Sequence, residues 1–167
     1  MQARGIFQGY GLQGVDDKGR VAIPAALRQV LEANNPRSAG GEVLRTLAIS
    51  PSETDTCLIA YDQSYPAELA RELSERAVAL TEPGRPVDRA AGRIGNGMVD
   101  LFTFDASGRF VLQGYPKKFA RIGKLAMFLA VGPYFEIWDP ETLLAERGDD
   151  ARLRGLVEYL LEERGAK

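Results

Sequence analysis

Hydrophobic and polar residues alternate along two stretches of the chain, and each stretch predicts strands around one short helix. In the first, Val21 and Ile23 begin an apolar run after a polar turn, and Pro24 opens a helix that an Asn-Asn-Pro sequence at 34–36 ends. The second has a similar short helix from Pro116 to 119, ended by a glycine at 123. Each helix should be followed by two strands, at 46–50 and 57–61 in the first stretch and at 125–131 and 134–138 in the second. The pattern therefore predicts the order β-β-α-β-β twice.

Helical spacing of apolar residues replaces this alternation in the connecting and C-terminal segments. Ser64 and Pro66 open a helix that ends at 82–84, a weaker helix is expected at 86–94, and Asp139 caps a third before a final helix. The apolar stripes of the first and last of these helices are Leu69, Leu73, Ala77 and Leu80, and Leu153, Leu156, Val157, Leu160 and Leu161. We interpret the stripes as packing surfaces against the β-rich units or a neighbouring subunit, rather than as ligand sites.

A nine-residue pattern, Φ-D-x-x-G-R-Φ-Φ-Φ with Φ an apolar residue, occurs at 15–23 and again at 104–112. The shift of 89 residues (105 − 16) that relates Asp16 to Asp105 also relates Arg28 to Lys117. Each copy predicts a β-hairpin, because Asp can cap a tight turn and Gly supplies the positive φ that closes it. The chain is therefore expected to be a duplicated α+β protein whose hairpins have a pseudo-twofold relation.

Composition narrows the possible chemistry. The 167 residues include no histidine, which excludes Ser-His-Asp and Cys-His catalysis and imidazole zinc sites. The single cysteine, Cys57, cannot form an internal disulfide and is expected to be a buried structural thiol. Neither a Walker loop nor a G-x-G-x-x-G turn is present. No cofactor and no metal are expected, and an enzyme using carboxylate pairs is the weaker alternative.

Apolar runs are too short for a membrane segment. The N-terminal segment that starts with Met-Gln-Ala-Arg at 1–4 contains no apolar run as long as that of a signal peptide. The longest apolar stretch, 125–131, is too short to span a bilayer. The sequence therefore predicts a cytoplasmic protein with no membrane partner.

The formal net charge of −2 argues against a nucleic-acid partner, since phosphate binding usually requires a basic excess. The acidic residues, however, gather at 68–82 and 139–163, whereas the two D-x-x-G-R turns are locally basic or neutral. Local charge at the turns can therefore differ in sign from the net charge of the chain.

Arg20 and Arg109 are the candidate DNA-contacting residues, because a guanidinium group can pair bidentately with phosphate or with the O6 and N7 atoms of guanine. Further candidates for phosphate contacts are Lys18, Arg28, Lys117 and Lys118. The residues expected to orient the turns are Asp16, Gly19, Asp105 and Gly108. The alternative is a plain hairpin with a local ion pair, and for Arg28 and Lys117 a solvated helix face. The aromatic residues Tyr61, Phe135 and Trp138 are expected in the core.

These segments resemble the MraZ family of bacterial regulators in the AbrB/MazE-like swapped-hairpin superfamily. The resemblance covers nearly the whole chain and depends on both D-x-x-x-R turns, Gly-Arg-Val-Ala-Ile-Pro at 19–24, Cys-Leu-Ile-Ala-Tyr at 57–61 and Phe-Glu-Ile-Trp at 135–138. It implies two tandem SpoVT-AbrB-like β-barrel units at 7–63 and 97–141, a helical connector at 64–96 and C-terminal helices at 142–167. Gln113 replaces Pro24, and Ser107 replaces Lys18, so the second helix start and the second turn depart from the first copy.

The resemblance also implies a function. Members of the family are expected to be nucleoid-associated repressors that bind double-stranded DNA as ring-like homo-oligomers, at short direct repeats upstream of their own division and cell-wall gene cluster. The competing hypothesis is a protein-interaction module, either an antitoxin-like partner binder or a scaffold. An antitoxin typically carries one copy followed by a disordered acidic tail, whereas this chain has a second folded copy.

Overall fold

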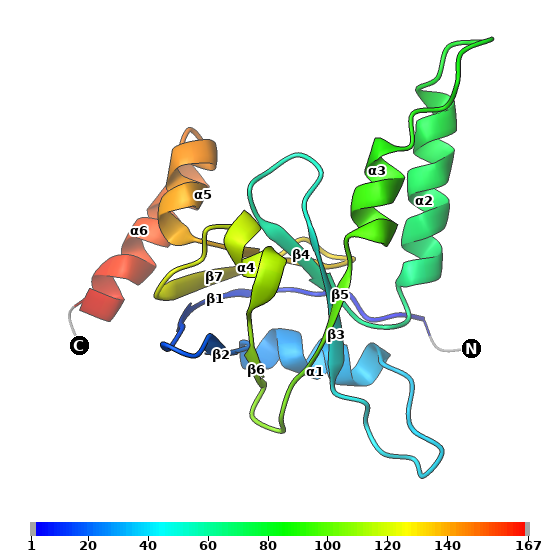
Figure 1. Cartoon of the computed structure of the whole chain (residues 1–167). Coiled ribbons are helices and arrows are strands. Elements are labelled where there is room, and N and C mark those ends of the chain that lie inside the picture. The colour runs from blue at the N-terminus through cyan, green and yellow to red at the C-terminus, as the bar shows by residue number, and fades with distance from the viewer. Residues whose placement is uncertain (1–2, 166–167) are drawn as a thin grey trace.

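The strands of the two repeats interleave in one antiparallel sheet in the computed structural model, which describes residues 3–165 (Figure 1). The six strands are β1 (Tyr10–Gly14), β3 (Thr46–Pro51), β4 (Leu58–Tyr61), β5 (Asp100–Thr103), β7 (Leu125–Ala130) and β8 (Phe135–Trp138). Their order is β1-β7-β8-β4-β3-β5. Exchanging each strand for its counterpart in the other repeat reverses this order, so the predicted pseudo-twofold relation is present, with its axis between β4 and β8.

The first strand of each repeat pairs with the third strand of the other repeat. Gly14 of β1 lies opposite Leu125 of β7, and Thr103 of β5 lies opposite Thr46 of β3. The mixed α+β class is confirmed, but the described residues form no closed barrel, in contrast to the two tandem barrels expected. The ranges 7–63 and 97–141 each keep the order β-β-α-β-β, yet their apolar side chains share one core.

Two short strands, β2 (Arg20–Ala22) and β6 (Arg109–Val111), form a separate antiparallel ribbon. The prediction of a hairpin within each repeat is therefore wrong in its pairing, although both turns form. The reason is the position of the backbone groups next to each turn. Leu112 N donates to Gly19 O at 2.8 Å and Ile23 N donates to Gly108 O at 2.9 Å, which directs each returning strand to the other repeat.

The short helices of the two repeats, α1 (Ala25–Asn34) and α4 (Gly114–Phe119), begin at equivalent positions, since 25 + 89 = 114. The replacement of Pro24 by Gln113 therefore leaves the helix start in place, two residues before the expected start at Pro116. Asn35 ends α1, and its side-chain amide donates to Leu44 O and Thr46 O at 2.9 Å. This contact joins the end of the helix to the start of β3.

The core contains the aromatic residues predicted for it. Tyr61, Phe135 and Trp138 are each no more than 2% exposed, and Cys57 is fully buried, as expected. Val21 and Phe110, which face each other across the β2–β6 ribbon, are also buried. The inner face of the ribbon is therefore fixed to the shared core.

The connector consists of α2 (Pro66–Ala79), α3 (Ala90–Gly92) and the π-helical turn η1 (Arg93–Gly97). Helices α2 and α3 stand side by side in Figure 1, and η1 also contacts α2. Leu69 and Leu73 are buried as predicted, whereas Leu80 is 79% exposed. The expected helix at 86–94 instead runs from 90 to 97, and the Asp88 carboxylate accepts from Ala90 N at 2.9 Å in a turn directly before it.

The C-terminal helices are α5 (Pro140–Arg147) and α6 (Ala151–Gly165). Asp139 caps α5 as predicted, and Val157 of α6 packs in a buried cluster with Trp138 and Cys57. Residues 166–167 of the predicted C-terminal region, and residues 1–2 of the N-terminal segment, lie outside the described residues. Among residues 3–165, every helix is too short or too polar to cross a membrane.

Candidate nucleic-acid interface

The first turn holds Arg20 through its own aspartate. Asp16 Oδ1 accepts from Lys18 N and Arg20 N, each at 2.9 Å, and Asp16 Oδ2 accepts from Arg20 Nε at 2.6 Å. The side-chain hydrogen bond from Arg20 is the main cause that holds the pKa of Asp16 below its usual range. The carboxylate is therefore ionised at neutral pH and fixes the direction of the arginine.

The second turn repeats this arrangement. Asp105 Oδ1 accepts from Ser107 N and Arg109 N at 2.9 Å, and Asp105 Oδ2 accepts from Arg109 Nε at 3.0 Å. Here the backbone hydrogen bond of Arg109 is the main cause that lowers the pKa of Asp105. The two turns differ at two positions, Asp17 against Ala106 and Lys18 against Ser107, but their hydrogen bonds are the same.

Arg20 and Arg109 lie on one face of the β2–β6 ribbon. Arg20 pairs with Val111 and Ala22 pairs with Arg109, so the two arginines alternate with the buried pair of Val21 and Phe110. Their side chains are 58% and 65% exposed. Because the strands are antiparallel, the two turns lie at opposite ends of the ribbon, and one outward face carries both guanidinium groups.

Each turn needs its glycine for the backbone conformation. Gly19 and Gly108 both have φ of +84°, in the left-handed region that disfavours residues with a side chain. A Cβ atom on Gly19 would lie 2.5 Å from the carbonyl oxygen of Leu112, and one on Gly108 would lie 3.1 Å from the carbonyl oxygen of Ile23. The absence of a side chain thus allows both turns to approach the other repeat closely.

The other predicted phosphate contacts are placed differently. Lys18 is exposed in the first turn, and Lys117 is half-buried on α4. Arg28 does not extend from a solvated helix face, because its Nη1 donates to the carbonyl oxygen of Ala106 at 2.6 Å. The structure therefore places Arg28 as a brace for the second turn, and a phosphate contact by Arg28 or Lys117 stays a prediction.

Two basic residues beside the ribbon were missed by the sequence analysis. A hollow of about 590 Å³ contains Arg20 and Arg109 together with Lys124 and Arg164. Lys124 lies directly before β7 and Arg164 at the end of α6, far in sequence from the first turn. A shift of 89 residues cannot identify Lys124, because its counterpart, Arg45, lies only 79 residues (124 − 45) before it.

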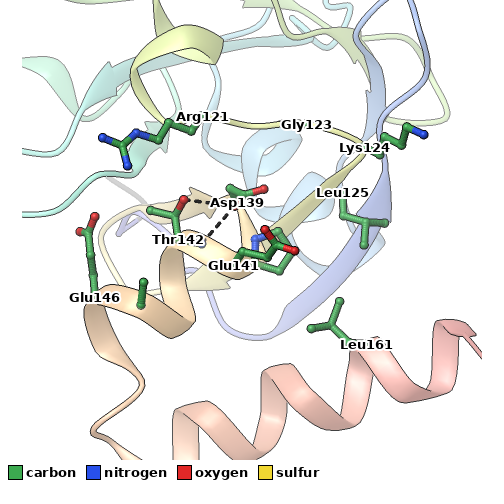
Figure 2. A pocket seen from close by; sticks show the side chains of 11 residues that line it. Arg121, Gly123, Lys124, Leu125, Asp139, Glu141, Thr142, Glu146 and Leu161 are labelled. Carbon is green, nitrogen blue, oxygen red and sulfur yellow. Dashed lines mark hydrogen bonds between the residues drawn. The ribbon is translucent and has the colours of Figure 1, made fainter.

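Another hollow, of about 650 Å³, lies between α5, α6 and the segment before β7 (Figure 2). One pair of its polar residues has a structural role. Asp139 Oδ2 accepts from Thr142 N at 3.0 Å and from Thr142 Oγ1 at 3.1 Å, which caps α5. This pair therefore stabilises the start of α5.

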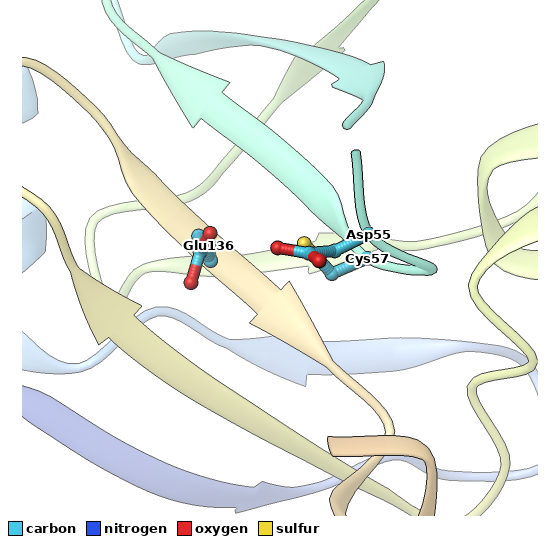
Figure 3. A group of neighbouring side chains, drawn as sticks. All are labelled: Asp55, Cys57 and Glu136. Carbon is cyan, nitrogen blue, oxygen red and sulfur yellow. The ribbon is translucent and has the colours of Figure 1, made fainter. Parts of the chain in front are cut away.

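Asp55, Cys57 and Glu136 bring three possible metal-ligating groups within 4.8 Å of one another (Figure 3). Each carboxylate has a protein partner, since Asp55 pairs with Arg147 and Glu136 Oε1 accepts from Trp138 Nε1 at 3.0 Å. Burial raises the pKa of the Cys57 thiol, which keeps it protonated at neutral pH. The cluster fits a half-buried polar contact between the segment before β4 and strand β8 better than a metal centre.

The fold and the ribbon together define a class: duplicated α+β proteins with exchanged strands that display arginines on a two-stranded ribbon. A search of protein-family models finds no match. Among curated proteins, the transcriptional regulator MraZ of Ruegeria sp. (strain TM1040) is 34% identical over 136 residues, 81% of this chain and 78% of the relative. MraZ of Methylococcus capsulatus is 30% identical over 154 residues, 90% of this chain and 92% of the relative.

A third relative, MraZ of Roseiflexus sp. (strain RS-1), is 31% identical over 135 residues, 81% of this chain and 82% of the relative. The chain belongs to the MraZ family of transcriptional regulators, and the resemblance inferred from its turns is confirmed. These relatives are named as regulators of transcription and not as enzymes.

Proposed function

We propose that this chain is a sequence-specific DNA-binding repressor that uses the outer face of the β2–β6 ribbon. The observation that carries the proposal is the position of Arg20 and Arg109 on one exposed face, each held by its own aspartate. A two-stranded β-ribbon fits the major groove of B-DNA, where base pairs present distinct donor and acceptor patterns. The predicted turn residues thus become positioning groups for the two arginines.

The ion pairs leave the ends of the arginine side chains available. Both aspartates bind the Nε atom, and among residues 3–165 no hydrogen bond engages the Nη atoms of Arg20 or Arg109. Bidentate pairing with guanine O6 and N7 uses such a fork of donors. Lys18 and Lys117 would add phosphate contacts that fix the register without reading sequence.

The oligomer is part of the proposal. An acidic chain with few basic groups per ribbon gains DNA affinity from several copies that bind together. The outer strands of the sheet, β1 and β5, carry exposed apolar residues, with Tyr10 51% and Leu101 62% exposed. Exposed apolar groups on an edge strand favour contact with another subunit. A ring of subunits would match short direct repeats in the DNA.

The resemblance to the MraZ family supports a proposal for the regulatory target. We propose that the protein binds upstream of its own division and cell-wall gene cluster and acts at the nucleoid. The test is footprinting of the purified full chain on the DNA upstream of its own gene. We expect protection of short repeats at regular spacing, and loss of the protected pattern with Arg20→Ala. Oligomerisation without protection of any DNA, even at low salt, would favour the scaffold alternative.

A further inference from the structure

Each D-x-x-G-R turn has a basic neighbour from the opposite repeat. Val15 N, directly before Asp16, donates to Lys124 O at 2.8 Å. Phe104 N, directly before Asp105, donates to Arg45 O at 2.9 Å. Lys124 and Arg45 precede β7 and β3, which are equivalent strands, so the two residues are pseudo-symmetry partners.

Arg45 and Lys124 differ in whether an acidic side chain pairs with them. Arg45 Nε pairs with the carboxylate of Glu32 at 3.4 Å, so the basic charge beside the second turn is compensated. Lys124 has no ion pair with any residue in the range 3–165. A pseudo-symmetric pair of positions therefore carries a compensated charge at one turn and an uncompensated charge at the other.

The C-terminal helix adds a second cation on the same side. Arg164 ends α6, whose last turn lies near the blue turn before β2 in Figure 1. Its guanidinium lies against Gly14, where a Cβ atom would approach Nη2 to 2.5 Å. Arg164, like Lys124, has no ion pair within the described part of the chain. The first turn thus has Arg164 of α6 beside it, whereas the guanidinium of Arg28 beside the second turn is engaged by the carbonyl oxygen of Ala106.

The hollow beside the first turn collects these charges. Its charged lining residues are Arg20, Arg109, Lys124, Arg164 and Asp16. Asp16, the single acidic group among them, is already paired with Arg20 at 2.6 Å. The remaining groups are cations on an exposed surface next to the outer face of the ribbon, a charge pattern complementary to a phosphodiester.

We propose that Lys124 and Arg164 bind a backbone phosphate of DNA beside the first turn. The second turn lacks such a pair of free cations, because Arg45 is paired with Glu32 and Arg28 donates to the carbonyl oxygen of Ala106. The proposal rests on DNA binding by the ribbon and adds a directional element to it. Phosphate contacts position a protein on the duplex without reading bases. An anchor at one end of a pseudo-symmetric ribbon would distinguish the two orientations of the ribbon along the groove, as binding to direct repeats requires.

The experiment measures DNA affinity as a function of salt for the wild type and for the double variant Lys124→Ala/Arg164→Ala. Two duplexes are used, one from upstream of the chain's own gene and one of random sequence and equal length. A lost phosphate contact lowers the slope of log K against log salt by about 0.9 for each phosphate. We expect a reduced slope and weaker binding on both duplexes, with the ratio of the two affinities unchanged.

The matched control is Arg85→Ala/Arg89→Ala, which also removes two positive charges, but from exposed positions in the connector. Figure 1 places this connector at the end of the molecule far from β2 and β6. If the control lowers the slope as much as the test variant does, net charge explains the effect and the anchor is overturned. An unchanged slope in Lys124→Ala/Arg164→Ala overturns it directly.

These outcomes separate the anchor from the proposed function. Preference for the upstream duplex with no effect of the double variant removes the anchor and keeps the regulator. A reduced slope without preference for the upstream duplex supports phosphate binding and contradicts sequence-specific regulation. Absence of binding to either duplex at low salt overturns both. Circular dichroism of each variant establishes that the fold is intact.

Discussion

The guanidinium of Arg28 in the first repeat donates a 2.6 Å hydrogen bond to the carbonyl oxygen of Ala106 in the second turn. Arg28 Cδ would also lie 3.1 Å from a Cβ atom on Gly108. The residue aligned with Arg28, Lys117, is half-buried on the equivalent helix. One member of this aligned pair therefore supports the turn of the other repeat.

Arg28→Ala should loosen the second turn, because it removes a hydrogen bond worth about 1 kcal/mol of unfolding free energy. Amide hydrogen exchange at Ser107 and Gly108 should accelerate, while exchange at Lys18 and Gly19 stays unchanged. Lys117→Ala is the matched variant and should alter neither turn. Equal protection of Ser107 in wild type and Arg28→Ala would remove the bracing role.

Arg20→Ala should weaken binding to the upstream DNA by about 1–3 kcal/mol per engaged site if Arg20 reads a guanine. The side chain is 58% exposed, so its truncation should leave the fold unchanged. Arg109→Ala should have a smaller effect, since Ser107 replaces the second cation, Lys18, that the first turn can offer to a phosphate. Operator titration at several salt concentrations, with circular dichroism, measures both losses. Wild-type affinity in folded Arg20→Ala would leave the turn as a hydrogen-bonded loop with a local ion pair.

Gly19→Ala should lower the unfolding free energy by roughly 1–3 kcal/mol, the cost of a non-glycine residue in the left-handed region. The contact of its Cβ with the Leu112 carbonyl oxygen at 2.5 Å adds to this cost. Gly108→Ala has the same φ but looser contacts of 3.1 Å, and should cost less. Urea denaturation compares the two. A larger loss for Gly108→Ala would contradict the packing of the first turn against Leu112.

Asp62→Ala should cost about 3–5 kcal/mol of stability, because it leaves a cation without its buried partner. The Asp62 side chain is fully buried and accepts from Arg4 Nη2 at 2.6 Å and from Asn34 Nδ2 at 3.0 Å. The test compares thermal unfolding of Asp62→Ala with that of Asp88→Ala, which removes an exposed aspartate that accepts a backbone hydrogen bond in a turn. Similar losses in the two variants would mean that the Arg4 contact contributes little.

Glu136→Gln should make stability less dependent on pH. Burial is the main cause that raises the pKa of Glu136 above its ordinary value of 4.5. The folded state then retains a proton that the unfolded chain has lost, so the unfolding free energy of the wild type decreases as pH rises through that window. Glutamine keeps the acceptor for Trp138 Nε1 without this ionisation. In denaturation experiments between pH 4 and 8, the unfolding free energy of the variant should increase relative to that of the wild type as the pH rises. A difference that stays constant with pH would contradict the raised pKa of Glu136.

Local patterns sufficed for most elements of the fold. The strand predicted at 134–138 is found as Phe135–Trp138, and the helix cap predicted at Asp139 is present. The partners of the strands could not be predicted, since alternation defines the two faces of a strand but not its neighbour. The alternation around Val21 fits a hairpin within the repeat as well as the observed pairing with Phe110.

Site residues were predictable where a motif contained them. Asp16 and Arg20 are four residues apart, and their contact follows from the turn itself. Lys124 and Arg164 reach the same region through the β1–β7 pairing and the packing of α6, which no local pattern encodes. The role of Arg28 depended in the same way on the backbone of the other repeat.

The exchange of strands makes this chain a covalently fused dimer of two small units. Gly14 pairs with Leu125, which lies 111 residues (125 − 14) further on. Strand β1 can therefore pair with β7 only after most of the chain has been synthesised. The linkage makes this association intramolecular and independent of protein concentration. It also allows the two halves to differ in sequence, because each half is encoded by its own stretch of one chain. Two identical chains would carry identical turns, whereas the fused pair holds Lys18 at one end of its ribbon and Ser107 at the other.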